Sequence, residues 1–197
     1  MSCAHCQTSR EKCFGGNRLR TRKSLLAGLV VSVLLCATGA IAQTIPPEWK
    51  ALDSLTGSWA GDGGGAPGQG SGAFSFHSDL QGRILMRTSF AEYPATKDRP
   101  AFRHDDLTIV YREGSDTKAI YFDNEGHVIH YAVSASPDGH KILFVSDLQP
   151  GAPRYRLTYE KTGENAVHLT FEIAPPGHPD EFRTYVQAAA HRTAGKQ

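Results

Sequence analysis

The sequence predicts an all-β fold, an antiparallel up-and-down barrel of about ten strands preceded by a short helix. Short segments of alternating apolar and polar residues follow one another along most of the chain, and Gly, Pro, Asn and Asp separate them. Alternation with a period of two is typical of a strand with one buried face. The connections are too short for crossover helices, which need about a dozen residues or more, so neighbouring strands should pair antiparallel.

Ten segments carry this strand signal. Leu107, Ile109 and Tyr111 alternate with polar residues in one of them, and Pro137-Asp138-Gly139 is an example of the turns between them. A closed barrel leaves no exposed strand edge, and a barrel of about eight to ten strands has room for side chains or one small ligand. The predicted strands are 57–63, 73–80, 84–93, 105–113, 117–123, 127–135, 141–147, 154–161, 166–174 and 182–192.

A short helix is predicted ahead of the first strand. Pro46-Pro47 suits a helix start, and Trp49, Leu52 and Leu55 recur at helical spacing. Between the first two strands lies the Gly-rich segment 61–72. It is not a phosphate loop, because a strand pattern follows it where a phosphate loop needs a helix. We interpret it as a hairpin connection.

The first 42 residues have the three parts of a secretory signal peptide. Basic residues are concentrated in 1–23, where Glu11 is the single acidic residue, and the segment 24–42 carries no charge. That segment ends in Ala40-Ile41-Ala42, a small-x-small cleavage site. We expect export, to the periplasm or as a secreted protein, after cleavage near Ala42. The predicted division of the chain is signal peptide 1–42, helical lead-in 43–56 and barrel 57–197.

Two other outcomes for this leader stay open. If it is not cleaved, its uncharged segment of 19 residues is long enough to span a bilayer and would be the chain's contact with a membrane. Lipidation would use Cys36, although Leu35 stands where a lipoprotein has a small residue.

Separating the leader changes the composition of the remainder. Residues 1–42 hold six of the 21 basic and one of the 20 acidic residues, so 43–197 has 15 basic and 19 acidic residues and a formal net charge of −4. An acidic domain repels phosphate, so we expect no nucleic-acid partner. All four cysteines lie in the leader, which leaves the barrel without thiol chemistry or disulfides: Cys3, Cys6, Cys13 and Cys36.

The segment 55–63 contains a Gly-x-Trp-x-Gly pattern formed by Gly57, Trp59 and Gly61, directly after the predicted helix. It resembles the calycin superfamily of lipocalins, fatty-acid-binding proteins and nitrobindin-like barrels. In these families the Trp lies at the barrel base and commonly packs against an Arg of the last strand. The resemblance implies that Trp59 packs against Arg192, with Arg183 as a second candidate, in a structural cation–π contact that closes the barrel.

The segment 80–85 looks like the hairpin of a calycin-like bacterial family that is often exported and whose function is unknown. The superfamily resemblance implies a small, mostly apolar ligand inside the barrel. Nitrobindin-like members bind haem through a His near the C-terminus, and His191 is the matching candidate here. The Gly-rich segment replaces that family's Tyr-Pro segment, which counts against haem.

The residues predict no catalytic centre, cofactor or metal site. There is no Gly-x-Ser-x-Gly nucleophile motif, and the barrel has no Cys. Paired acids such as Asp105-Asp106 are interpreted as solvated loop edges. His127 and His130 should point to opposite faces of a strand, and Asp123-Asn124-Glu125-Gly126 is interpreted as a hairpin turn. We therefore expect a protein that is not an enzyme.

The barrel interior remains the candidate site, because a few polar groups can orient a ligand in an apolar pocket. Three hypotheses stay open: a barrel that binds a small apolar molecule, a haem-binding barrel, and a filled barrel with a structural or interaction role. Candidate apolar interior residues are Met86, Phe90, Ile120, Phe122, Ile142, Phe144, Leu157 and Tyr159. The candidate polar pocket residues, if they point inward, are Arg87, Tyr111, Tyr131 and Arg156.

Overall fold

The computed structural model describes residues 47–62 and 70–194. They form one closed antiparallel barrel with one short α-helix, as predicted. The predicted leader and most of the Gly-rich segment lie outside the described residues. Among the residues described, no helix has the length and apolar character needed to cross a membrane.

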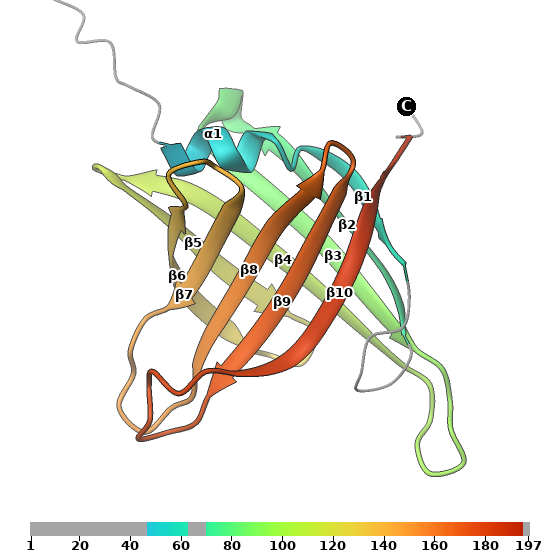
Figure 1. Cartoon of the computed structure of the whole chain (residues 1–197). Helices are drawn as coiled ribbons and strands as arrows, with labels where there is room; N and C mark the ends of the chain where they lie inside the picture. The colour runs from blue at the N-terminus through green and yellow to red at the C-terminus, as the bar shows by residue number, and fades with distance from the viewer. Residues whose placement is uncertain (1–46, 63–69, 195–197) are drawn as a thin grey trace, which may run out of the picture. The chain divides into compact units, whose positions relative to one another are not determined.

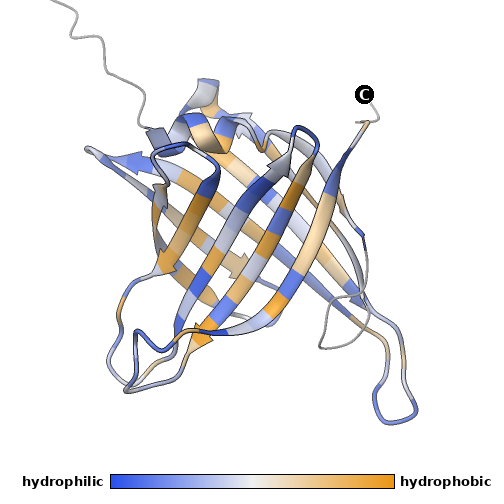
Figure 2. Cartoon of the chain, in the orientation of Figure 1, coloured by the Kyte–Doolittle hydropathy of each residue, from blue (hydrophilic) through white to orange (hydrophobic). Residues whose placement is uncertain are grey.

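Ten strands follow one another around the barrel, and β1 pairs with β10 to close it (Figure 1). Each of the ten predicted strands is present. Hydrophilic and hydrophobic bands alternate along the strands, as expected for walls with two different faces (Figure 2). The strands are β1 (Gly57–Gly61), β2 (Ser71–Asp79), β3 (Ile84–Tyr93), β4 (Phe102–Glu113), β5 (Asp116–Asp123), β6 (Val128–Ala135), β7 (Lys141–Ser146), β8 (Arg154–Gly163), β9 (Ala166–Ala174) and β10 (Arg183–Thr193). A single 3-10 turn, η1 (Leu80–Gly82), connects β2 to β3.

The start of β4 differs from the prediction, because the strand begins at Phe102 and not at residue 105. Phe102 pairs with Tyr93 of β3, and the two rings stack with their centroids 6.2 Å apart. The alternation of apolar and polar residues is lost over these first residues, since polar side chains occupy the inner face of the barrel there. The pattern therefore could not mark this part of the strand.

Helix α1 (Pro47–Asp53) covers one end of the barrel, next to β6 and β7 (Figure 1). Pro47 is its first residue, where a missing backbone N–H has no consequence. Leu52, and Leu55 just after the helix, are completely buried. Thr117 of β5 donates a hydrogen bond of 2.7 Å to Glu48, which ties the helix to the wall. The helix thus closes this end, which we call the capped end.

The inner wall differs between the two ends. Around the capped end the inward side chains are buried and pack as one apolar core; its largest members include Trp59, Phe74, Phe76, Phe144 and Tyr159. Their rings contact one another with centroids 5.6–6.0 Å apart. Toward the opposite end, at the β3–β4 and β5–β6 connections, the inward side chains are only partly buried. Among the residues that the structure describes, the barrel is therefore filled at the capped end and open at the other, which we call the open end.

Candidate functional site

The capped end is closed by a contact between the first and last strands. The Arg192 guanidinium lies 4.3 Å from the centroid of the Trp59 ring and donates a hydrogen bond of 2.8 Å to the carbonyl of Ser54. Trp59 Nε1 donates a 2.8 Å hydrogen bond to the carbonyl of Leu55. Arg183 begins β10 and is highly exposed beside Glu181, so Arg192 is the arginine that lies over Trp59.

Gly57 is required at this closure for two reasons. Its φ is +113°, in the region that only glycine adopts without strain. A Cβ atom at this position would also lie 2.8 Å from Arg192 Nη1. The Gly-x-Trp motif therefore lets the arginine approach the backbone where it covers the tryptophan.

A buried ion pair lies about halfway along the inner wall. Arg87 of β3 donates a hydrogen bond to Asp106 of β4, and the two side chains are only 8% and 7% exposed. The guanidinium also lies 5.5 Å from the centroid of the Phe74 ring. Burial opposes the charge on Arg87, but Asp106 and the neighbouring tyrosines hold its pKa above the ordinary value. This ion pair therefore lies where the filled half of the interior, at the capped end, meets the open half.

Two buried polar atoms in this region have no hydrogen-bond partner among the described residues. One is Nε of Arg87 itself, and the other is the hydroxyl of Tyr159. Burial raises the pKa of Tyr159 to about 12, although the nearby positive charge of Arg87 opposes it. Burial also raises the pKa of Tyr131, another inward tyrosine of this region. Both hydroxyls are therefore neutral donors near neutral pH, and a buried polar atom without a partner is unfavourable unless a water or a ligand pairs with it.

A cavity of ≈ 160 Å³ opens next to Arg87, along the continuous stretch of wall formed by β9, β10, β1, β2 and β3. Gly72, Ala91, Ala188 and Ala190 face inward there, and their small size leaves the space unfilled. The rest of its inner lining is mostly apolar and includes Phe74, Leu169 and Val186. The cavity combines an apolar wall with one buried cation, which is the composition of a small-molecule site.

Two of the four polar pocket candidates point into the barrel, and the other two lie on its outer wall. Arg87 and Tyr131 are buried and point inward. Tyr111 and Arg156 lie on the outer wall, because the residues next to them, Val110 and Leu157, belong to the inner face. Arg156 pairs there with Glu172 through hydrogen bonds of 2.6 and 2.8 Å, and its guanidinium lies 4.3 Å from the Phe182 ring.

Strand register also separates the apolar candidates. Ile142, Phe144, Leu157 and Tyr159 belong to the core or pack against it. Met86, Phe90, Ile120 and Phe122 have the opposite parity to the buried residues Leu85, Arg87 and Ala119, so they lie outside. Four of the eight apolar candidates therefore lie outside, because the alternation left the choice of face open.

His191 lies on the outer wall, between the inward-facing Ala190 and Arg192 of β10. Its side chain is 56% exposed and forms an ion-pair contact with Asp62. From this position the ring points away from the interior. His191 therefore cannot serve as an axial ligand to a group held inside the barrel.

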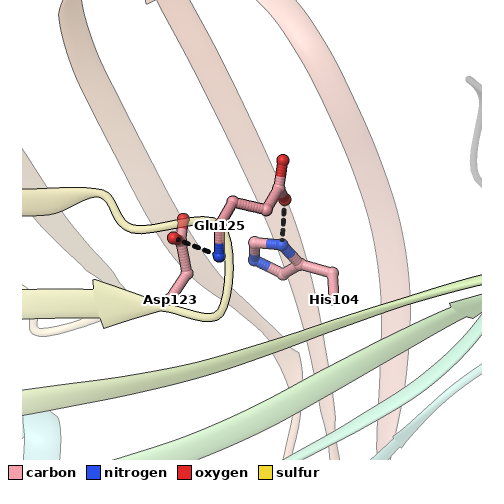
Figure 3. Close-up of side chains that lie close together, drawn as sticks. All are labelled: His104, Asp123 and Glu125. Carbon is pink, nitrogen blue, oxygen red and sulfur yellow. Dashed lines mark hydrogen bonds and ion pairs between the residues drawn. The ribbon is translucent and has the colours of Figure 1, made fainter.

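A polar cluster at the open end was not predicted from the sequence. His104 of β4 meets Asp123, at the end of β5, and Glu125 in the β5–β6 turn (Figure 3). We call these three residues the rim cluster. Asp106, interpreted from the sequence as a solvated loop edge, is instead buried inside the barrel next to it, with a carboxylate oxygen 3.8 Å from His104 Nε2. The turn itself forms as predicted, but its partner His104 is distant in the sequence, and only the β4–β5 register brings them together.

Among solved structures, the barrel is similar to the "Crystal Structure of Rv2717c from M. tuberculosis". The TM-score is 0.55 and 18% of residues are identical; the match covers 76% of this chain and 99% of the other. At this identity the likeness shows the fold alone. No protein-family model and no curated protein matches the chain.

Proposed function

We propose that the chain is an exported, calycin-like barrel that binds a small, mostly apolar molecule in the open half of its interior. The observation that carries the proposal is the cavity beside Arg87, whose Nε has no hydrogen-bond partner among the described residues. An apolar wall would hold the body of the ligand by burial of its surface. Arg87 would orient one oxygen atom of the ligand by a hydrogen bond.

The volume of the cavity indicates the size of the part of a ligand that it would enclose. The value of ≈ 160 Å³ is close to that of an engineered cavity of about 150 Å³ that binds benzene. It is smaller than the range of roughly 300–1,000 Å³ that is usual for drug-sized ligands. The proposed ligand class is therefore a monocyclic or short-chain molecule with one oxygen that accepts a hydrogen bond.

Haem fits this interior less well than a small molecule does. A porphyrin ring needs much more space than the cavity provides, and His191 points outward. A filled barrel without a ligand is the remaining alternative to the proposal. It predicts that the protein does not respond to any molecule of the size of the cavity.

Two alanines of β10 provide a matched test. Ala188 faces inward and lines the cavity, whereas its neighbour Ala189 is exposed on the outer wall. Ala188→Leu extends an apolar side chain into the ligand space, and Ala189→Leu makes the same change outside it. The probes are p-cresol, hexanoate and toluene, and toluene lacks the oxygen that Arg87 would contact.

We expect p-cresol to raise the thermal unfolding midpoint of the parent protein and of Ala189→Leu, but not that of Ala188→Leu. Toluene should bind more weakly than p-cresol, by roughly tenfold for the loss of one hydrogen bond to a charged group. Equal stabilisation of the two variants would place the binding outside the cavity. No response of the parent to any of the three probes would support the barrel without a ligand.

The export part of the proposal is supported by the leader at 1–42 and has a separate test. The protein is produced in bacteria with its own N-terminus, the cells are fractionated, and the intact mass is measured. Cleavage after Ala42 predicts a soluble exported product that begins at Gln43. A full-length chain in the membrane fraction would instead identify the segment 24–42 as an anchor.

A further inference from the structure

We propose that the rim cluster is a binding site for one divalent transition-metal ion, with His104, Asp123 and Glu125 as its ligands. Each residue offers one ligand atom, and the three atoms lie within 4.8 Å of one another. The site lies at the open end and is distinct from the cavity beside Arg87. Its test is therefore independent of the proposed ligand-binding function.

Figure 3 shows the His104 ring facing the Glu125 carboxylate, with the Asp123 carboxylate against the backbone N–H of Glu125. His104 Nδ1 lies 2.7 Å from Glu125 Oε1. Ligand atoms about 2.0–2.2 Å from a zinc ion lie roughly 3–3.5 Å from one another. The side chains therefore need only small rotations to surround an ion, and Glu125, which lies in a turn and is exposed, is free to make them.

The balance of charge at this end favours a cation. The Asp123 side chain is only 3% exposed, and its single ion-pair partner among the described residues is His127. Glu125 likewise pairs only with a histidine, His104, among those residues. The nearby Arg87 is already paired with Asp106. Two carboxylates are thus held together without a permanently positive side chain, and a metal ion would supply the missing charge.

The Asp123 carboxylate is held in place by its neighbours. The Nδ1 atom of the His127 ring lies 2.8 Å from Asp123 Oδ2, and the Tyr121 hydroxyl donates to the same oxygen at 3.1 Å. The backbone N–H groups of Glu125 and His127 also donate to Asp123 Oδ1, at 3.0 and 2.9 Å. These contacts fix the carboxylate in its place at the end of β5.

His104 is held in a way that suits a metal ligand. While Nδ1 faces Glu125, Nε2 lies 3.0 Å from the Tyr121 hydroxyl, which donates to Asp123 Oδ2 at 3.1 Å. A metal-bound histidine usually has its second nitrogen held in this way, and the contact sets the ring orientation. The Tyr121 hydroxyl therefore contacts two of the proposed ligands, His104 and Asp123.

The ligand types indicate the class of ion. A histidine nitrogen with two carboxylate oxygens suits Zn²⁺ and its neighbours in the first transition row, whereas Ca²⁺ and Mg²⁺ prefer oxygen atoms alone. Three protein ligands would leave a coordination position for water or another molecule.

The test is a titration of the purified full chain with Cys3, Cys6, Cys13 and Cys36 replaced by Ser, since thiols would bind the same ions. ZnCl₂ binding is measured by calorimetry, and CoCl₂ binding by the visible absorption that reports the coordination of Co²⁺. The test variants are His104→Gln and Glu125→Gln. Asp123 is left unchanged because it also holds the β5–β6 turn.

Matched control variants are His77→Gln, exposed on β2, and Glu164→Gln, exposed in the β8–β9 turn. We expect one Zn²⁺ per chain and a Co²⁺ spectrum in the parent and both controls. Each test variant should lose the Co²⁺ spectrum and bind Zn²⁺ at least tenfold more weakly while its circular dichroism spectrum stays unchanged, as expected from the loss of one metal ligand. No saturable binding at millimolar metal, or equal binding by the test and control variants, would overturn the proposal.

Discussion

Replacement of Arg87 by Met leaves the buried Asp106 carboxylate without its cation. Asp106 is only 7% exposed, and in the described part of the chain the other basic group close to it is His104, whose Nε2 lies 3.8 Å from the carboxylate. Breaking a buried ion pair in this way destabilises a protein by about 3–5 kcal/mol, because the remaining charge has lost both water and its partner. Asp106→Leu should be similarly unfavourable, since it strands the Arg87 guanidinium.

The double variant Arg87→Met/Asp106→Leu gives the opposite expectation. It removes both charges, and apolar replacement of a buried pair is typically neutral or stabilising by about 1–4 kcal/mol. Urea unfolding followed by tryptophan fluorescence gives the free energies for all four proteins. Single variants within about 0.5 kcal/mol of the parent would refute the buried-pair interpretation, because such values are typical of surface substitutions.

The same double variant separates stability from binding. If Arg87 is retained because it orients a ligand, the folded double variant should bind p-cresol about tenfold more weakly than the parent, for the loss of one hydrogen bond to a charged group. Unchanged affinity would show that the ion pair has no part in ligand binding. Toluene, which lacks the oxygen, serves as the control and should bind both proteins equally.

Three further predictions concern the closure and the core. Trp59→Ala should lower the free energy of unfolding by about 3–5 kcal/mol, measured in urea, and an unchanged midpoint would contradict the closing role of Trp59. Gly57→Ala should be more destabilising than Gly126→Ala, since both have positive φ but only Gly57 has Arg192 where the methyl group would lie. Because the pKa of Tyr159 is raised to about 12, its contribution to stability is complete below the unfolded value of about 10 and is lost as the pH rises to about 12. Tyr159→Phe should flatten this alkaline fall, and an identical slope in both proteins would contradict it.

Most of the fold could be predicted from the alternation of apolar and polar residues and from the Gly-x-Trp motif. Alternation located all ten strands, because it depends on which faces are buried and not on which strands pair. The resemblance to calycin barrels implied that Arg192 lies over Trp59, and the pairing of β1 with β10 brings the two residues together. These features are local, or follow from the order of the strands alone.

For β3–β5, the sequence could not show which face of the strand points into the barrel. Met86, Ile109 and Ile120 form an apolar row across the outer wall, so both faces of these strands carry apolar residues. A period of two then identifies a strand without showing which side is inside, and Tyr111 was a candidate for this reason. The inner position of Arg87 is visible only from the register that pairs it with Thr108.

The rim cluster could not be predicted for a different reason. Its members come from two strands and a turn, and the spacing from His104 to Asp123 and Glu125 matches no metal-binding motif. The β4–β5 register, with Asp106 opposite Asp123, decides that they meet. A sequence signal would have required the pairing of these strands to be known residue by residue.

The interior ligand site is tested most directly by nuclear Overhauser effects between bound p-cresol and the methyl groups of the protein. The cavity predicts contacts from the p-cresol ring to Leu169 and Val186, both of which line it. Val128 and Leu148 are exposed and provide reference methyl groups outside the cavity. Contacts to Leu169 and Val186 alone would establish binding in the open half, and contacts limited to the exposed methyl groups, or no contacts, would contradict it.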